Sequence, residues 1–117
     1  MKTTLVLTSL VLFVAACGSN GAHTNDPDIH ADGRPKGEQL IAGSDCLSCH
    51  KDEEQLVGPA YKAVAERYAG KADAVQLLAG KIIKGGSGNW GQTPMTPHPG
   101  ISQDDAEEMV RYILSKK

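Results

Sequence analysis

Five consecutive residues, Cys46-Leu47-Ser48-Cys49-His50, have types and a spacing that could do chemistry together. Cysteines three positions apart share one face of a helical turn, so both thiols can form thioether bonds to one edge of a porphyrin. The next residue, His50, can then turn its imidazole beneath the metal. Such a run is typical of c-type haem attachment. We therefore expect one haem c, bound covalently through Cys46 and Cys49 and ligated by His50.

Two other kinds of site also use paired cysteines. A redox disulfide of the thioredoxin type would need a βαβ pattern nearby, and a closed zinc site would need about four Cys or His ligands at tight spacing. The chain shows neither pattern, and its only other cysteine is Cys17. These residues therefore favour haem attachment, with a structural disulfide and a zinc site as the alternatives.

A second iron ligand is expected among the methionines, because a soft thioether suits haem iron opposite a histidine. Met1 lies in a segment that we expect to be removed, and Met109 falls on the apolar stripe of a predicted helix. Met95 lies instead within residues 85–100, a stretch with five glycines, three prolines and the only tryptophan. We expect Met95 to be the distal ligand. The alternative ligand is His98, three residues further along the chain.

The sequence around these residues predicts the helices that must position them, and the expected fold is all-α. Helices are expected over residues 36–49, from Pro59 to Gly70, over about 72–84, and from Ser102 onward, separated by glycine and proline. Ser102 has the residue type of an N-cap for the last helix. That helix carries an apolar stripe of Ala106, Met109, Val110, Ile113 and Leu114. No stretch alternates well enough to predict a sheet.

The start of the chain predicts export and a lipid anchor. Residues 1–16 combine a positive start with an apolar stretch, and Val14-Ala15-Ala16-Cys17 resembles the bacterial lipobox. Acyl chains on Cys17 would hold the protein at a membrane, on the periplasmic or cell-surface side. The alternative is an ordinary secretory signal with an incidental cysteine. Residues 17–35 are polar and predict a flexible tether, which leaves residues 36–117 as the folded domain.

Composition limits the possible functions further. The chain has 117 residues and a net charge of -2, which fits one small domain and does not suggest nucleic acid as a partner. Only 4% of the residues are aromatic, so the protein core would be thin. A large apolar ligand such as a porphyrin would add to that core.

Four short motifs, in order and at similar spacing, resemble the small bacterial class I c-type cytochromes of the cytochrome c-551 kind. They are Cys46 to His50, Val57-Gly58-Pro59-Ala60-Tyr61, Trp90-Gly91 and Pro94-Met95. The resemblance covers about residues 36–117 and implies a class I cytochrome c fold, with about four helices wrapped around one haem.

The resemblance also implies roles for individual residues. It implies that His50 is the proximal ligand and Met95 the distal one. The carbonyl of Pro59 would accept a hydrogen bond from the proximal imidazole and so orient its ring. The indole of Trp90 would donate to a haem propionate, which Lys81 would also contact.

With both axial positions of the iron filled, we expect an electron carrier and no enzyme. The expected partners are respiratory redox proteins, met transiently, and a membrane reached through lipidated Cys17; no nucleic acid and no small-molecule substrate are expected. Two alternatives remain. Without Met95 as a ligand, the domain would be a five-coordinate haem sensor or peroxidase-type protein. The chain would otherwise be a cytochrome subunit of a larger oxidase or reductase complex.

Overall fold

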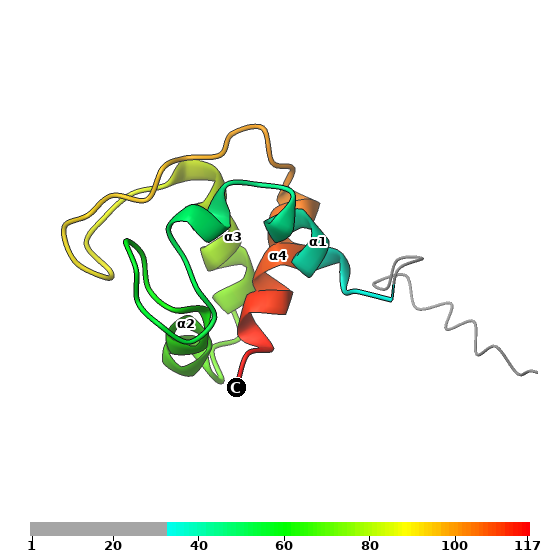
Figure 1. Ribbon diagram of the computed structural model, residues 1–117, viewed down its shortest axis with the longest axis horizontal. Helices are drawn as coiled ribbons and strands as arrows, with labels where there is room; N and C mark the ends of the chain where they lie inside the picture. The colour runs from blue at the N-terminus through cyan, green and yellow to red at the C-terminus, as the bar shows by residue number, and fades with distance from the viewer. Residues whose placement is uncertain (1–32) are drawn as a thin grey trace, which may run out of the picture.

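The computed structural model describes residues 33–117. The predicted signal segment 1–16 and most of the predicted tether, with Cys17, lie outside these residues. Within them are four α-helices, α1 (Lys36–Ala42), α2 (Tyr61–Tyr68), α3 (Ala74–Lys84) and α4 (Gln103–Leu114), and a short 3-10 helix, η1 (Cys46–Ser48). The expected all-α architecture is confirmed, and no strand is present in this part of the chain (Figure 1).

Helix α4 is the central element, because it contacts α1, α2 and α3. The helix α1 lies on the side where the described chain begins, whereas the segments that follow η1 and α3 extend on the other side of the helices (Figure 1). Among residues 33–117, no helix is long and apolar enough to cross a bilayer.

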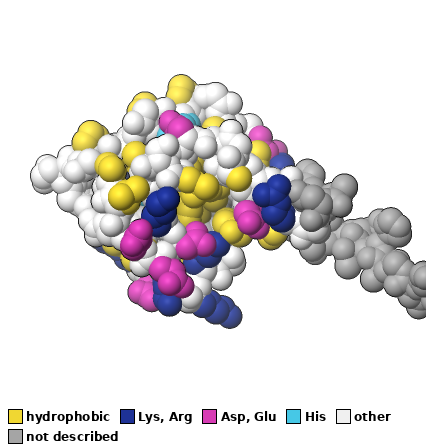
Figure 2. Space-filling view, in the orientation of Figure 1, with side chains coloured by type: hydrophobic (Ala, Val, Ile, Leu, Met, Phe, Trp, Pro, Cys, Tyr) yellow, Lys and Arg dark blue, Asp and Glu magenta, His cyan; other side chains and the backbone are white. Residues whose placement is uncertain are grey.

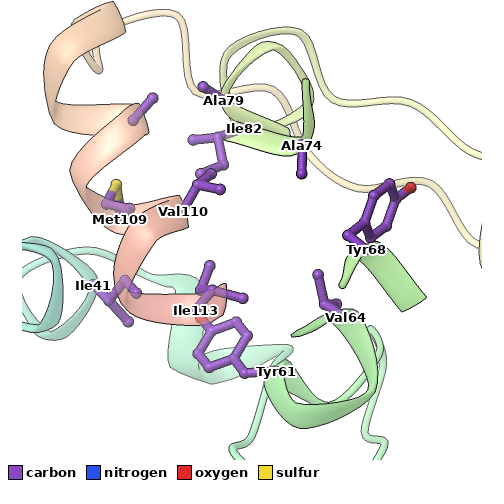
Figure 3. Packing of buried hydrophobic residues seen from close by; sticks show 11 residues of the cluster. Ile41, Tyr61, Val64, Tyr68, Ala74, Ala79, Ile82, Met109, Val110 and Ile113 are labelled. Carbon is purple, nitrogen blue, oxygen red and sulfur yellow. The ribbon is translucent and has the colours of Figure 1, made fainter. Parts of the chain in front are cut away.

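The core is built from apolar side chains of all four α-helices, which converge around α4 (Figure 3). The predicted stripe of α4 is buried at Ala106, Met109, Val110 and Ile113, and Leu114 is partly buried against the same cluster. The other helices contribute Ile41, Tyr61, Val64, Tyr68, Ala74, Ala79 and Ile82. Burial of this apolar surface supplies most of the free energy that holds the helices together.

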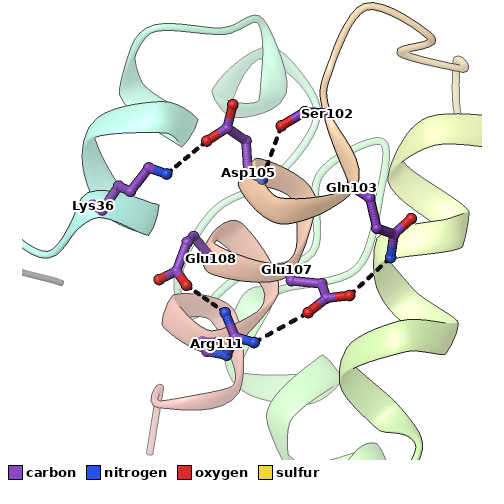
Figure 4. Close-up of polar contacts among 7 residues, drawn as sticks. All are labelled: Lys36, Ser102, Gln103, Asp105, Glu107, Glu108 and Arg111. Carbon is purple, nitrogen blue, oxygen red and sulfur yellow. Dashed lines mark hydrogen bonds and ion pairs between the residues drawn. The ribbon is translucent and has the colours of Figure 1, made fainter. Parts of the chain in front are cut away.

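The start of α4 is capped as the sequence predicted. The backbone N–H of Asp105 donates to the hydroxyl of Ser102 at 3.1 Å, and the Asp105 carboxylate pairs with Lys36 of α1 at 2.8 Å (Figure 4). One turn further on, Arg111 pairs with Glu108 and, at 3.1 Å, with Glu107. Of these contacts, the ion pair between Lys36 and Asp105 links α1 to α4.

The first predicted helix was too long, since α1 ends at Ala42 and not at residue 49. Gly43 follows the helix, and the hydroxyl of Ser44 donates to the backbone carbonyls of Leu40 at 2.8 Å and Ile41 at 3.0 Å. These bonds satisfy carbonyls that a continuing helix would use, so the chain leaves the helix axis there. The two cysteines consequently lie on the separate turn η1 and its end.

The second predicted helix was too long at its start. It begins at Tyr61 and not at Pro59, because Ala60 has an extended backbone with φ -60° and ψ 143°. The third helix begins at Ala74, close to the predicted residue 72. Boundaries of this kind are the least certain part of any sequence-based assignment.

Gly37 sets how closely α1 approaches α4. A Cβ atom at this position would overlap the backbone carbonyl oxygen of Glu108 and lie 2.7 Å from the Cβ of Tyr112. We expect Gly37→Ala to lower the free energy of unfolding by about 1–3 kcal/mol, as overpacking of a core does. Denaturant unfolding of the haem-loaded protein would measure this change.

Gly80 offers a matched control for this substitution, because a Cβ atom there would meet nothing within 4 Å. It lies in the interior of α3, so Gly80→Ala should raise the free energy of unfolding by about 0.5–1 kcal/mol. Equal stability of Gly37→Ala and the unsubstituted protein would show that the two helices can separate without cost.

Candidate haem site

A large cleft lies between the helices and the loops that follow η1 and α3. Its apolar lining comes from every helix and includes Ile41, Val64, Tyr68, Leu78, Ile82, Val110 and Ile113. It holds about 1340 Å³ of empty space, including the open solvent at its mouth. Figure 2 shows hydrophobic side chains gathered near the middle of this face of the molecule. The cleft therefore suits a large, flat and mostly apolar group.

The two thiols lie at the edge of this cleft. Backbone N–H groups of Cys49 and His50 donate to the carbonyl of Cys46 at 3.1 and 3.0 Å, which closes one helical turn. Cys46 and Cys49 both line the cleft, and they form no disulfide with each other. No group of three or more His, Cys, Asp or Glu side chains within residues 33–117 is arranged to hold a metal ion.

The ring of His50 is fixed in orientation. Its Nδ1 lies 2.8 Å from the carbonyl oxygen of Pro59. Since a carbonyl can only accept, Nδ1 carries the proton and donates, and the lone pair remains on Nε2 for a metal. The observed contact has the partners that the resemblance implied.

Two further residues, Tyr61 and Gly58, lie close to the same ring. Tyr61 stacks on it, with ring centroids 5.4 Å apart and an angle of 15° between the planes. Burial raises the pKa of the Tyr61 hydroxyl above its usual value, so the phenol stays neutral beside the imidazole. A Cβ atom at Gly58 would overlap the imidazole and lie 2.8 Å from its Nδ1. Only glycine at this position leaves room for the ring.

Met95 lies at the base of a closed loop. Its backbone pairs with Gly86 through hydrogen bonds of 3.1 and 2.9 Å, an isolated antiparallel bridge that the sequence did not predict. Gly85 and Gly86 have φ of 66° and 117°, which other residues rarely adopt. Met95 is partly buried against the core, and it lines the same cleft as His50. Met109 also lines the cleft, but it is 1% exposed and packs within the core cluster.

Trp90 and Lys81 both line the cleft as well. Trp90 is 39% exposed, and the guanidinium of Arg67 lies over its ring at 4.6 Å from the centroid. Arg67 Nη1 also donates to the carbonyl of Asn89 at 2.6 Å. Sequence reasoning missed Arg67 as a brace for this tryptophan, because nothing in the sequence pairs α2 with the loop after α3.

His98 has partners other than a metal. Its Nε2 lies 2.8 Å from Oδ1 of Asp45, and its Nδ1 lies 3.3 Å from the carbonyl oxygen of Ile82. The hydrogen bond and the charge of His98 lower the pKa of the Asp45 carboxyl. The His98 ring is therefore held by partners of its own, which favours Met95 over His98 as the second ligand.

An apolar cleft, two thiols on one turn and an imidazole with its Nε2 lone pair available fit a porphyrin held by thioether bonds. This binding mode defines the c-type haem proteins. The family model described as Cytochrome c matches residues 35–117, and the chain belongs to this family.

Individual relatives agree with this assignment. The chain is 49% identical over 80 residues to cytochrome c-552 of Hydrogenobacter thermophilus, a match that covers 68% of this chain and 81% of that protein. It is 36% identical over 99 residues to cytochrome c-551 of Pseudomonas aeruginosa, with 85% of each chain covered. The crystal structure of wild-type Nitrosomonas europaea cytochrome c552 matches with a TM-score of 0.66 and 45% identity, covering 68% of this chain and 99% of that one.

These findings confirm the expected class I cytochrome c fold. The protein is a mono-haem electron carrier of the cytochrome c-551 and c-552 kind. Its haem c is attached covalently through Cys46 and Cys49.

The packing of Gly58 against His50 yields a direct test. We expect Gly58→Ala to push the imidazole out of position, because the new methyl group would occupy the space of the ring. The haem would stay attached through Cys46 and Cys49. The absorption spectrum should show a weakened low-spin signal, and carbon monoxide or imidazole should bind more readily. Gly80→Ala is the control, and an unchanged spectrum in Gly58→Ala would show that the contact does not constrain the ring.

Proposed function

We propose that this protein carries single electrons between respiratory redox proteins in a bacterial cell envelope, with His50 and Met95 as the axial ligands of its haem iron. When bound, the haem supplies an iron centre that alternates between the ferrous and ferric states. The observation that carries the ligand assignment is the hydrogen bond from His50 Nδ1 to the Pro59 carbonyl, which leaves Nε2 available to a metal.

The remaining residues of the cleft have supporting roles in this proposal. Tyr61 and Gly58 hold the His50 ring at a constant angle, so that the ligand does not reorganise during electron transfer. The mostly apolar lining would limit contact of the haem with water, and within residues 33–117 the buried side chains are apolar residues and tyrosines. Burial and axial ligand identity are two of the properties by which a protein sets the reduction potential of its haem. Trp90 and Lys81 would contact a propionate.

No enzymatic turnover is proposed, since family membership fits an electron carrier and the proposed ligands fill both axial positions. Two other functions remain distinguishable. A five-coordinate sensor or peroxidase-type domain would lack Met95 as a ligand. A subunit of a larger oxidase or reductase complex would copurify with a stoichiometric partner after gentle detergent extraction.

The role of Met95 can be tested by substitution. We expect Met95→Ala to keep its haem but to lose the thioether-to-iron charge-transfer band of the oxidised protein, because the sixth position would open. Met109→Leu is the matched control, since a volume-conserving change in the core should cost less than about 1.5 kcal/mol and leave the band intact. A band that survives in Met95→Ala would exclude Met95 as the ligand.

We further propose that the protein is exported and anchored by acyl chains on Cys17. The support is the lipobox-like run that ends at Cys17, and the covalent haem, which bacteria attach outside the cytoplasm. Residues 17–35 would then act as a tether between the membrane and the domain at 36–117. Partners would share that membrane or lie within reach of the tether.

The anchor can be tested in cells by fractionation. We expect Cys17→Ser to move the haem protein from the membrane fraction to the soluble fraction, because several acyl chains supply the membrane affinity. Ser19→Ala, two residues along the same segment, should leave the protein in the membrane fraction. The intact mass of the mature protein would show the haem and the acyl chains together. Cys17→Ser protein that stays membrane-bound would refute the anchor.

A further inference from the structure

One side-chain hydrogen bond joins two segments that both hold the haem but lie far apart in the sequence. His98 Nε2 lies 2.8 Å from Oδ1 of Asp45, across a separation of 53 residues. Asp45 directly precedes Cys46, which carries one of the thioether bonds. His98 follows Met95 by three residues. All four residues line the same cleft, so the pair joins two parts of its rim.

His98 is also anchored to the helix behind it. Its backbone N–H donates to the carbonyl of Ile82 in α3 at 3.1 Å, and its Nδ1 lies 3.3 Å from the same oxygen. Its side chain is only 19% exposed, although that of Asp45 is 71% exposed. His98 therefore holds a defined position between α3 and the segment that leads into η1.

The chain on either side of His98 offers few backbone N–H donors. Pro97 and Pro99 flank the histidine, and neither has a backbone N–H to donate. Within residues 97–99, His98 is thus the only residue with a backbone donor. Only Thr96 and Pro97 separate it from Met95, so a movement that withdraws Met95 from the cleft must also displace His98.

We propose that the Asp45–His98 pair is a clasp that keeps the Met95 loop closed over the cleft and so holds the thioether in place against outside ligands. This inference rests on the proposed role of Met95 as distal ligand. Asp45 and His98 are positioning residues, since they act through Met95. Opening the loop would require the pair to separate, and an external ligand gains access only in the open state.

The effect should be modest but measurable. An ion pair with one exposed partner contributes little by itself, and a hydrogen bond to a charged group contributes somewhat more. We therefore expect imidazole to bind the oxidised haem protein about two- to tenfold more tightly in Asp45→Asn or His98→Gln than in the unsubstituted protein. Loss of the thioether-to-iron band during the titration would report the displacement of Met95.

The double variant and a control make the test specific. Because the two residues act as one unit, the double variant should bind imidazole no more tightly than the more affected single variant. Asp52→Asn is the matched control, since it breaks the Lys116–Asp52 ion pair, which is also 2.8 Å long but does not involve the Met95 loop. Its imidazole affinity should stay within about twofold of the unsubstituted protein.

The possible failures are distinguishable. If both single variants bind imidazole like the unsubstituted protein while the band is intact, the clasp is refuted and the proposed function stands. Additive effects in the double variant, or an equal effect of Asp52→Asn, would refute the clasp in favour of general loosening. If the unsubstituted haem protein lacks the band altogether, the ligand role of Met95 fails, and the clasp fails with it.

Discussion

The hydrogen bond between His50 Nδ1 and the Pro59 carbonyl is the interaction on which the site depends. It assigns the proton to Nδ1 and turns Nε2 toward any metal in the cleft. It also explains why Pro59 lies outside α2, since a carbonyl directed at the imidazole leaves the path of the helix. Tyr61 then begins α2 and stacks on the same ring. The orientation of the imidazole is thus set by the start of α2.

Helix α4 gives this arrangement its support. It packs against α1, α2 and α3, the three helices whose ends lead into the cysteine turn, the His50 loop and the Met95 loop. Gly37 lets α1 approach α4 closely, and the pairing of Lys36 with Asp105 adds a polar contact to that crossing. Residues outside the cleft lining therefore set how closely α1 packs on the helix that supports the cleft.

The cleft is closed by contacts between loops and distant elements. Arg67 braces Trp90 from α2, and Gly86 pairs with Met95 across its own loop. His98 joins the segment before Cys46 to α3. These polar contacts lie mostly at the edge of the protein, where each contributes little to stability but restricts which way a flexible segment points. A carrier whose ligands keep their positions loses less energy to reorganisation.

Local chemistry in the sequence was enough to predict the all-α class, the capping of α4 by Ser102, the turn that presents Cys46 and Cys49, and the need for glycine after α3. Each of these depends on residues within a few positions of one another. Only the tertiary structure decided that Arg67 covers Trp90 and that His98 meets Asp45. Such contacts join residues far apart in the chain, so no local pattern encodes them; packing around α4 brings them together.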